Sequence, residues 1–243
     1  MAATHERLNR YLARRGVSSR RSADSLISAG RVTVNGATAT IGASVDPELD
    51  RISVDGRAIA HATRPETLML NKPVGVVTTV HDPQGPPTVM DLVTAVPGLV
   101  PVGRLDADSR GLLLLSSDGE LVHRLTHPRH GVTKRYRLVL DRDVAPEHLR
   151  RLVAGVYLED GPARALAARR GSTVAGNVIE VTMGEGRKRE VRRLCAALGL
   201  RVTDLVRVAF GPIRLGRLQP ARARPLTAGE ERDLYVCVGL VVP

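Results

Sequence analysis

The sequence predicts an α+β fold, with a small helix–helix–hairpin domain followed by a larger domain on a mixed, mainly antiparallel sheet. Helical and strand-like periods are interspersed without the strict strand–helix–strand alternation that parallel sheets require. The length of 243 residues suits one ordinary domain plus a smaller one. We therefore expect domains at residues 1–60 and 68–243, joined by a polar linker at 61–67 that contains Pro65.

The N-terminal sixty residues carry the pattern of a compact module. Residues 6–15 place apolar side chains at helical spacing and end before a glycine, and a second helix ends at the next glycine. Two strand pairs follow, one around Asn-Gly at 35–36 and one around Asp-Gly at 55–56. Both dipeptides favour the tight turns that join antiparallel strands, so we expect two hairpins.

The larger domain alternates between segments of strand and helix period. Asp118 is placed to cap a helix over residues 120–126. The expected strands are residues 68–79 (interrupted at Lys72-Pro73), a short segment near residue 100, and 112–115, 134–140, 177–183, 201–210 and 213–219. The further expected helices are residues 145–156, 187–199 and 227–235. This order supports the mainly antiparallel sheet.

Composition narrows the class of partner. The chain has 36 Lys and Arg against 25 Asp and Glu, a formal charge of +11, which favours an acidic partner such as nucleic acid. Its only aromatic residues are Tyr11, Tyr136, Tyr157, Phe210 and Tyr235. RNA readers that stack several bases on a sheet of aromatic rings need more, so that class is excluded.

The apolar runs and the cysteines indicate an intracellular protein. No run is long enough to cross a bilayer, and the first residues lack the apolar segment of a secretory signal. Cys195 and Cys237 lie in no metal-binding or disulfide spacing. We therefore expect a cytoplasmic protein, a monomer, with no membrane partner.

Basic residues concentrate at the N-terminus. Residues 1–31 carry seven Arg against two acidic residues. A guanidinium fits phosphate in a bidentate fork, so this cluster predicts contact with an RNA backbone, although a solvated helix face would look similar. The candidate RNA-binding residues are Arg7, Arg10, Arg14, Arg20, Arg21 and Arg31.

The segment RLNRYLARRGVSSRRSADSLISAGRVTVNG resembles the alpha-L (S4-like) RNA-binding domain, found in a small-subunit ribosomal protein and in several rRNA-modifying enzymes. The resemblance covers most of residues 6–59. It implies that the two helices and the adjoining turn dock on structured RNA.

A second cluster, GRLDADSRG, brings Asp106 and Asp108 between arginines. A calcium loop would need further oxygen ligands, but Arg110 and Ser117 occupy two of their positions. A two-metal nuclease would need more carboxylates converging from elsewhere. A single carboxylate nucleophile is the third reading, and an ordinary polar turn is the fourth.

The ordered segments LNKPVGVVTT, GRLDADSRGLLLLSSDGELVHRLTHP, KRY and EGRKREVRRL resemble the RsuA/RluB-type rRNA pseudouridine synthases. With the N-terminal domain, the resemblance covers roughly residues 6–235. It implies that Asp106 is the catalytic residue, that Tyr136 stacks on the target base, and that Arg192 pairs with Asp106.

Three positions depart from the family pattern. Family members often carry Thr where Ser109 stands, Thr-Asn where Ser116-Ser117 stand, and Gln where Glu190 stands. The first two changes keep polar side chains of similar size, whereas the third adds a negative charge beside the helix that carries Arg192.

The resemblance implies isomerisation of one uridine of ribosomal RNA, with the large-subunit RNA slightly favoured. No atoms are gained, so neither a cofactor nor a metal is needed. Arg104 and Lys134 would add basic contacts to the substrate, and residues 112–115 would supply an apolar wall that excludes water. The expected partner is ribosomal RNA or a pre-ribosomal particle.

Two other functional classes fit parts of the pattern. A non-catalytic RNA-binding or ribosome-assembly factor would use only the basic surfaces, and would have no need of the set Asp106, Tyr136 and Arg192. A metal-dependent nuclease would cleave RNA in a reaction that a chelator stops. Sequence does not decide whether Asp106 attacks the ribose or the base.

Overall fold

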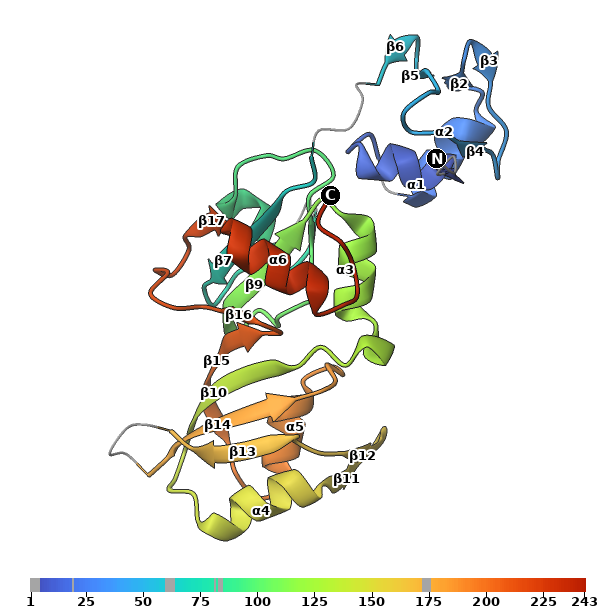
Figure 1. Cartoon of the computed structure of the whole chain (residues 1–243). Helices are drawn as coiled ribbons and strands as arrows, with labels where there is room; N and C mark the ends of the chain where they lie inside the picture. The colour runs from blue at the N-terminus through green and yellow to red at the C-terminus, as the bar shows by residue number, and fades with distance from the viewer. Residues whose placement is uncertain (1–4, 19, 60–63, 81, 83–84, 172–175) are drawn as a thin grey trace.

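The computed structural model describes residues 5–18, 20–59, 64–80, 82, 85–171 and 176–243. A small N-terminal domain lies at one end of a larger sheet domain (Figure 1). This is the α+β arrangement that the sequence predicts, with a mostly antiparallel sheet. No helix within the described ranges is long and apolar enough to span a membrane.

Two helices and short strands form the N-terminal domain. Its elements are β1 (Glu6–Arg7), α1 (Leu8–Arg14), α2 (Arg20–Ser28), β2 (Val32–Val34), β3 (Ala37–Thr38), β4 (Ser44–Val45), β5 (Ile52–Val54) and β6 (Arg57–Ala58). The helix faces of α1 and α2 bury Leu8, Leu12 and Ile27 against the strands. Both predicted hairpins form, because Asn35 and Asp55 adopt the positive φ that these turns require.

The larger domain is built on one long twisted sheet. Its strands are β7 (Thr67–Lys72), β8 (Val100–Pro101), β9 (Arg110–Ser116), β10 (Lys134–Leu140), β13 (Ala167–Arg170), β14 (Val178–Met183), β15 (Val202–Phe210), β16 (Ile213–Arg214) and β17 (Ala223–Pro225). The main order is β13-β14-β10-β15-β9-β7-β17, and only β15 and β9 pair in parallel. Strands β10 and β15 therefore lie at the centre, beside the start of β9.

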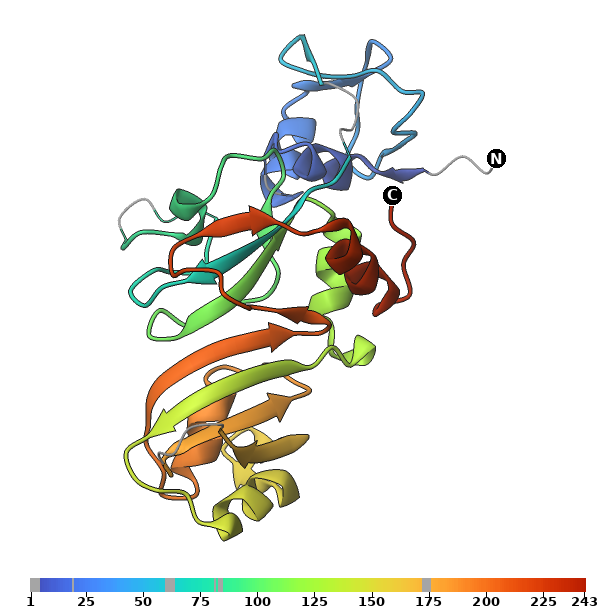
Figure 2. The same ribbon diagram turned by 60° about the vertical axis from the view of Figure 1, so that its left-hand side comes forward.

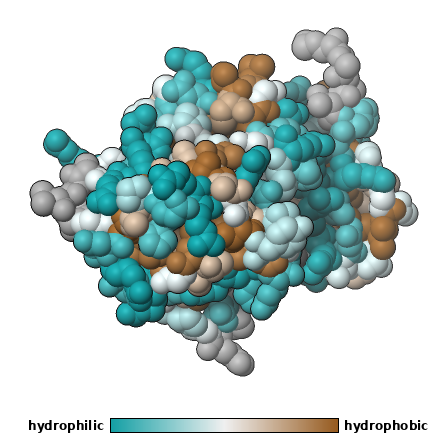
Figure 3. All heavy atoms as spheres, turned by 90° about the horizontal axis from the view of Figure 1, so that it is seen from below, coloured by the Kyte–Doolittle hydropathy of each residue, from teal (hydrophilic) through white to brown (hydrophobic). Residues whose placement is uncertain are grey.

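Helices and a separate hairpin cover the sheet. They are α3 (Gly119–Thr126), α4 (Pro146–Ala154), α5 (Glu190–Ala196), α6 (Ala228–Val236), the 3₁₀ turns η1 (Val89–Leu92) and η2 (Pro128–His130), and the hairpin of β11 (Val156–Leu158) and β12 (Gly161–Ala163). Helices α3 and α6 lie on the same side of the sheet (Figure 2). The surface seen from below is a mosaic in which small apolar groups alternate with hydrophilic side chains (Figure 3).

Both faces of the sheet are buried near β9. Leu113 and Leu115 point into one core, and Leu112 and Leu114 point into the core under α3 and α6. The predicted cap on α3 forms, because the Asp118 carboxylate accepts hydrogen bonds from the first backbone N–H groups of the helix. Because β9 is buried on both faces, its position is firmly fixed. The loop that carries Asp106 runs directly into its first residue, Arg110.

One predicted helix starts later than expected. The sequence predicts a helix from residue 187, but α5 begins at Glu190 because Arg189 has a φ of 51° and cannot continue a right-handed helix backwards. Residues 187–189 form a loop instead. Strands β1, β4, β11, β12, β13 and β17 were not expected from the sequence, and β1 takes the first two residues of the helix expected over residues 6–15.

The two domains touch through α1. Arg10 donates a hydrogen bond to Glu120 of α3 at 3.1 Å. A Cβ atom on Gly98 would lie 2.3 Å from the carbonyl oxygen of Arg14, so the glycine permits this close approach. The expected linker at 61–67 stays a prediction: part of it lies outside the described residues, and Thr67 already belongs to β7.

Candidate active site

Asp106 lies in the loop that leads from β8 into β9. The backbone N–H of Ser109 donates to the carbonyl oxygen of Asp106 at 3.0 Å, which closes a tight turn around Ala107 and Asp108. Ala107 accepts a hydrogen bond from the backbone of Gly75, which follows β7. The loop is therefore fastened by backbone contacts on both sides.

A buried lysine anchors the same loop from beneath. Lys72, at the end of β7, is 0% exposed, and its Nζ donates to the carbonyl oxygens of Pro73, Asp106 and Ser109 at 3.0, 3.1 and 2.8 Å. Burial lowers the pKa of Lys72 to about 8, and the nearby carboxylates of Asp108 and Asp106 oppose this shift. The sequence placed Lys72 in a motif but assigned it no role.

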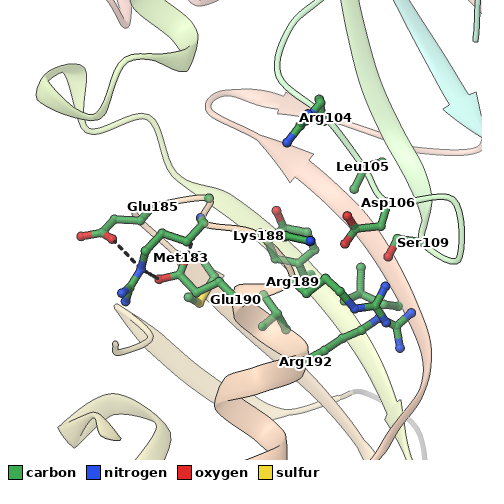
Figure 4. A pocket seen from close by; sticks show the side chains of 15 residues that line it. Arg104, Leu105, Asp106, Ser109, Met183, Glu185, Lys188, Arg189, Glu190 and Arg192 are labelled. Carbon is green, nitrogen blue, oxygen red and sulfur yellow. Dashed lines mark hydrogen bonds and ion pairs between the residues drawn. The ribbon is translucent and has the colours of Figure 1, made fainter. Parts of the chain in front are cut away.

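The Asp106 side chain lines a pocket of about 100 Å³ between its loop, β10 and the start of α5. We call it the base pocket, after the expectation that Tyr136 stacks on a base. Figure 4 shows Asp106 and Ser109 on one side of it, with Met183 and Glu190 across from them. The polar lining residues are Arg104, Asp106, Ser109, Glu185, Arg187, Lys188, Arg189, Glu190 and Arg192. The apolar and aromatic lining residues are Leu105, Tyr136, Met183, Val191 and Leu205.

Four of the five predicted catalytic and substrate-binding residues therefore line one pocket. They are Asp106, Tyr136, Arg192 and Arg104. Tyr136 comes from β10 and is 8% exposed, so its ring forms part of the wall. The expected apolar wall does not come from residues 112–115, which are buried in the two cores; Leu105, Met183, Val191 and Leu205 supply it.

The arginines at the start of α5 hold Asp108. Arg189 Nη2 lies 2.7 Å from Asp108 Oδ2, and Arg192 donates to the Asp108 carbonyl oxygen at 3.0 Å. The hydrogen bond from Arg189 and the charge of Arg192 hold the pKa of Asp108 below its usual value. Within the described part of the chain, Arg192 makes no ion pair with Asp106, so the pairing of these two residues stays a prediction.

Glu190, which departs from the family pattern, has a local structural partner. Its side chain is buried and accepts hydrogen bonds from the backbone N–H and the Nε of Arg187, at 3.2 and 3.0 Å. The negative charge that the sequence places beside Arg192 is therefore matched by Arg187. The pair fixes the loop before α5 against the base pocket.

Arg207, which the sequence analysis did not single out, lines the cavity next to the base pocket. It lies in β15, is 2% exposed, and donates through Nε to the carbonyl oxygen of Leu112 at 2.6 Å. Burial lowers its pKa, and Tyr136 opposes that shift. The available signal was an arginine inside a run of apolar strand residues, Leu205 to Phe210.

Lys134 lies outside the base pocket. It lines a neighbouring cavity of about 230 Å³, which shares Arg104 and Tyr136 with the base pocket and also borders Arg207. The two cavities also share Glu185, Gly186 and Arg187. The structure thus places Lys134 in a cavity next to the one that the other four predicted residues line.

Several N-terminal arginines are engaged in contacts within the protein. Arg7 donates to the carbonyl oxygen of Gly42, Arg10 to Glu120, and Arg14 to Glu6. Arg14 is also partly buried. The predicted basic surface is therefore smaller than the count of arginines indicates.

The other three predicted RNA-binding arginines are one paired residue, Arg31, and two unpaired residues, Arg20 and Arg21. Arg31 forms a bidentate pair with Asp55, with distances of 2.8 and 2.5 Å. Arg20 and Arg21 are exposed at the start of α2, and neither forms an ion pair with any described residue. Of the six predicted RNA-binding residues, these two present the freest charge. Among described residues, no cluster of three or more His, Cys, Asp or Glu side chains could hold a metal ion.

Family models match both domains. The model for RNA pseudouridylate synthase matches residues 66–197, and the S4 domain model matches residues 6–49. A solved structure described as a pseudouridylate synthase superposes with a TM-score of 0.66 at 30% identity, covering 94% of this chain and 99% of that one.

Relatives from several bacteria carry names of the same family. An uncharacterized RNA pseudouridine synthase of Aquifex aeolicus is 41% identical over 96% of this chain and 95% of its own length. One of Mycobacterium tuberculosis is 42% identical over 96% and 94%. A ribosomal large subunit pseudouridine synthase B of Pseudomonas aeruginosa is 41% identical over 97% of this chain and 63% of its own length.

Proposed function

The chain belongs to the family of RNA pseudouridylate synthases, and we propose that it isomerises one uridine of ribosomal RNA, with Asp106 as the nucleophile. The observation that carries the role of Asp106 is its position. Its side chain lines the base pocket opposite an apolar wall and Tyr136. It forms no ion pair with any described residue, whereas the neighbouring Asp108 is held by two arginines.

The reaction conserves every atom of the uridine. The bond between ribose C1′ and uracil N1 breaks, the uracil turns within the pocket, and a bond forms between C1′ and C5. The proton on C5 leaves, and N1 gains a proton. The Asp106 carboxylate forms a transient bond either to C1′ or to C6 of the uracil and is released when the new bond is made. Because nothing is oxidised or reduced, the proposal needs no cofactor.

The lining residues suit the holding of a detached base. The Tyr136 ring gives one flat face, and the apolar side chains around it exclude water that would otherwise capture the ribose. A uridine in folded RNA must first be flipped out of its stack, at a cost of a few kcal/mol. Arg104 at the pocket mouth and the N-terminal arginines offset that cost by binding phosphates.

The ribosomal substrate is supported by the named relatives. The Pseudomonas aeruginosa protein, and others of the same name from Vibrio cholerae and Pasteurella multocida, are described as acting on the large ribosomal subunit. We therefore propose large-subunit RNA as the substrate. Mapping pseudouridines in both rRNAs from strains with and without the gene identifies the target, and a missing small-subunit pseudouridine would overturn the choice of subunit.

The test of the nucleophile is Asp106→Asn, which keeps the shape of the side chain and removes its charge. We expect the purified variant to lose at least about 10³-fold in rate on rRNA from a strain lacking the gene, because the covalent step is removed. Pseudouridine is measured by mass spectrometry of digested RNA. The control is Asp233→Asn on the exposed face of α6, which should retain full activity.

Each result has a distinct meaning. If Asp106→Asn makes pseudouridine at the rate of the parent protein, the assignment of the nucleophile is wrong. If the parent protein makes none while binding rRNA, a non-catalytic binding factor is the better description.

A further inference from the structure

The cavity that Lys134 and Tyr136 line is strongly cationic. Arg104, Lys134, Arg187 and Arg207 line it, against one carboxylate, Glu185. We call it the cationic cavity. Its volume is about 230 Å³, and it shares Tyr136 and Arg104 with the base pocket. A molecule whose base lies against Tyr136 would therefore have its backbone at the boundary of the two.

Arg207 brings a buried charge to this cavity without a matching acid. Its Nε donates to the carbonyl oxygen of Leu112 at 2.6 Å and its Nη1 to that of Arg104 at 3.5 Å, and Tyr136 contributes a side-chain hydrogen bond. Its buried Nη2 has no hydrogen-bond partner, and no described carboxylate lies within ion-pair distance of the guanidinium. Neutral groups therefore satisfy part of this guanidinium, but no acid matches its charge, which suits a site that binds an anion.

Lys134 increases the imbalance. Its Nζ lies 5.6 Å from the centre of the Phe210 ring, and the Arg207 guanidinium carbon lies 5.2 Å from the same ring. Burial and then the charge of Arg207 lower the pKa of Lys134, and the charges of Glu190 and Glu185 oppose this shift. Two cations thus share one aromatic ring, and within the described ranges neither has a carboxylate partner.

The single carboxylate of the cavity is already occupied. Glu185 lies 3.4 Å from Arg187 Nε. Figure 4 shows the Glu185 side chain on the opposite side of the pocket from Asp106. Arg187 also binds Glu190 and Asp160, so its own charge is matched within the protein. The charge left unmatched in the cavity is that of Arg104, Lys134 and Arg207.

We propose that the cationic cavity binds a backbone phosphate attached to the target uridine, while the base occupies the neighbouring base pocket, with which the cavity shares Tyr136. The inference rests on the proposed function, because it takes a uridine in the base pocket as given. A phosphate is doubly suited to the site: it accepts several hydrogen bonds at once and carries the charge that the buried cations lack. Lys134 is the contacting residue, and Arg207 supports it from beneath.

The test uses three probes on the full chain: uridine, uridine 5′-monophosphate and uridine 3′-monophosphate. We expect one monophosphate to bind at least about 5-fold more tightly than uridine, as measured by ligand-observed NMR titration, since a charge-assisted contact adds about 1 kcal/mol or more. Lys134→Gln should abolish that gain. Arg217→Gln, which removes an exposed arginine remote from both cavities, should preserve it.

Arg207 is tested by a pair of variants, because removing a buried arginine can prevent folding. Arg207→Lys keeps the charge and should retain part of the gain, whereas Arg207→Gln should lose it with an unchanged affinity for uridine. The proposal is overturned if both monophosphates bind no better than uridine, or if Lys134→Gln keeps the gain in full. Binding is measured without turnover, so a failure of the uridine-isomerising function would be recognised separately in the rRNA assay.

Discussion

The two basic regions of the molecule handle their charge in opposite ways. The N-terminal domain displays many arginines, yet Arg10, Arg14 and Arg31 are paired with carboxylates of the protein itself. In the centre of the larger domain, Lys72 and Arg207 are buried and have no carboxylate in contact among the described residues. The number of basic residues in a region therefore does not indicate how much unneutralised positive charge that region has.

The difference follows from solvation. An exposed arginine gains little from its ion pair and loses little when the pair is broken, because water screens the charge. A buried cation must be satisfied by oriented dipoles or by a ligand, since water does not reach it. Lys72 is satisfied by three carbonyl oxygens, whereas Arg207 retains an unpaired nitrogen. One of these sites is complete without substrate, and the other is not.

The largest effect is expected from removing the Lys72 ammonium group, whose hydrogen bonds are all satisfied within the protein. Lys72→Met deletes the three hydrogen bonds that fix the loop of Asp106. We expect kcat to fall about 100-fold, because a shift of about 1 Å in a reacting group costs that much. The measurement is the rate of pseudouridine formation at saturating rRNA. Arg217→Gln should leave kcat unchanged, and a Lys72→Met variant with normal kcat would show that the anchor is dispensable.

A second prediction concerns the charge of Lys72 and pH. Its pKa in the folded protein is about 8, below the ordinary 10.5, so the folded state disfavours the charged form. The cost is fully present below pH 8 and is relieved as pH rises toward 10.5. We expect the unfolding free energy of the parent, relative to that of Lys72→Met, to rise by about 2 kcal/mol between pH 7 and 10. Urea unfolding at several pH values measures it, and a flat difference would contradict it.

Much of the fold could be predicted because its signals are local. The Asn-Gly and Asp-Gly turns, and the cap at Asp118, depend on one or two residues each and form as expected. The start of α5 could not be placed, because the left-handed backbone of Arg189 interrupts a sequence with good helical spacing. Its contact with Asp108, which lies in another segment of the chain, accompanies that conformation. Such pairings are invisible in a single sequence.

For the candidate site, the sequence indicated which segments come together but not the individual contacts. The motif order indicated Asp106 and Tyr136, and both line one pocket. The pairing of Arg192 with Asp106 stays a prediction, and in the structure the Arg192 guanidinium contacts Asp108, two residues further along the same loop. Sequence can identify which segments meet, but a single sequence does not show which of two neighbouring carboxylates an arginine contacts. Arg207 looked like any residue of an alternating strand, because its burial depends on packing from β9 and β10.

The smallest expected effect is on rRNA binding by the N-terminal domain, where unpaired and paired arginines can be compared directly. Replacing both Arg20 and Arg21 with Gln removes two exposed charges that no described carboxylate neutralises. We expect rRNA affinity to fall about 10-fold and the slope of log affinity against log salt to decrease by about 1 to 2. Arg31→Gln is the matched control, because Asp55 already offsets that charge, and it should weaken binding about 2-fold at most. Filter binding at several salt concentrations measures both. Equal losses for the paired and the unpaired arginines would mean that RNA displaces Asp55, and that pairing within the free protein does not determine which surface arginines bind RNA.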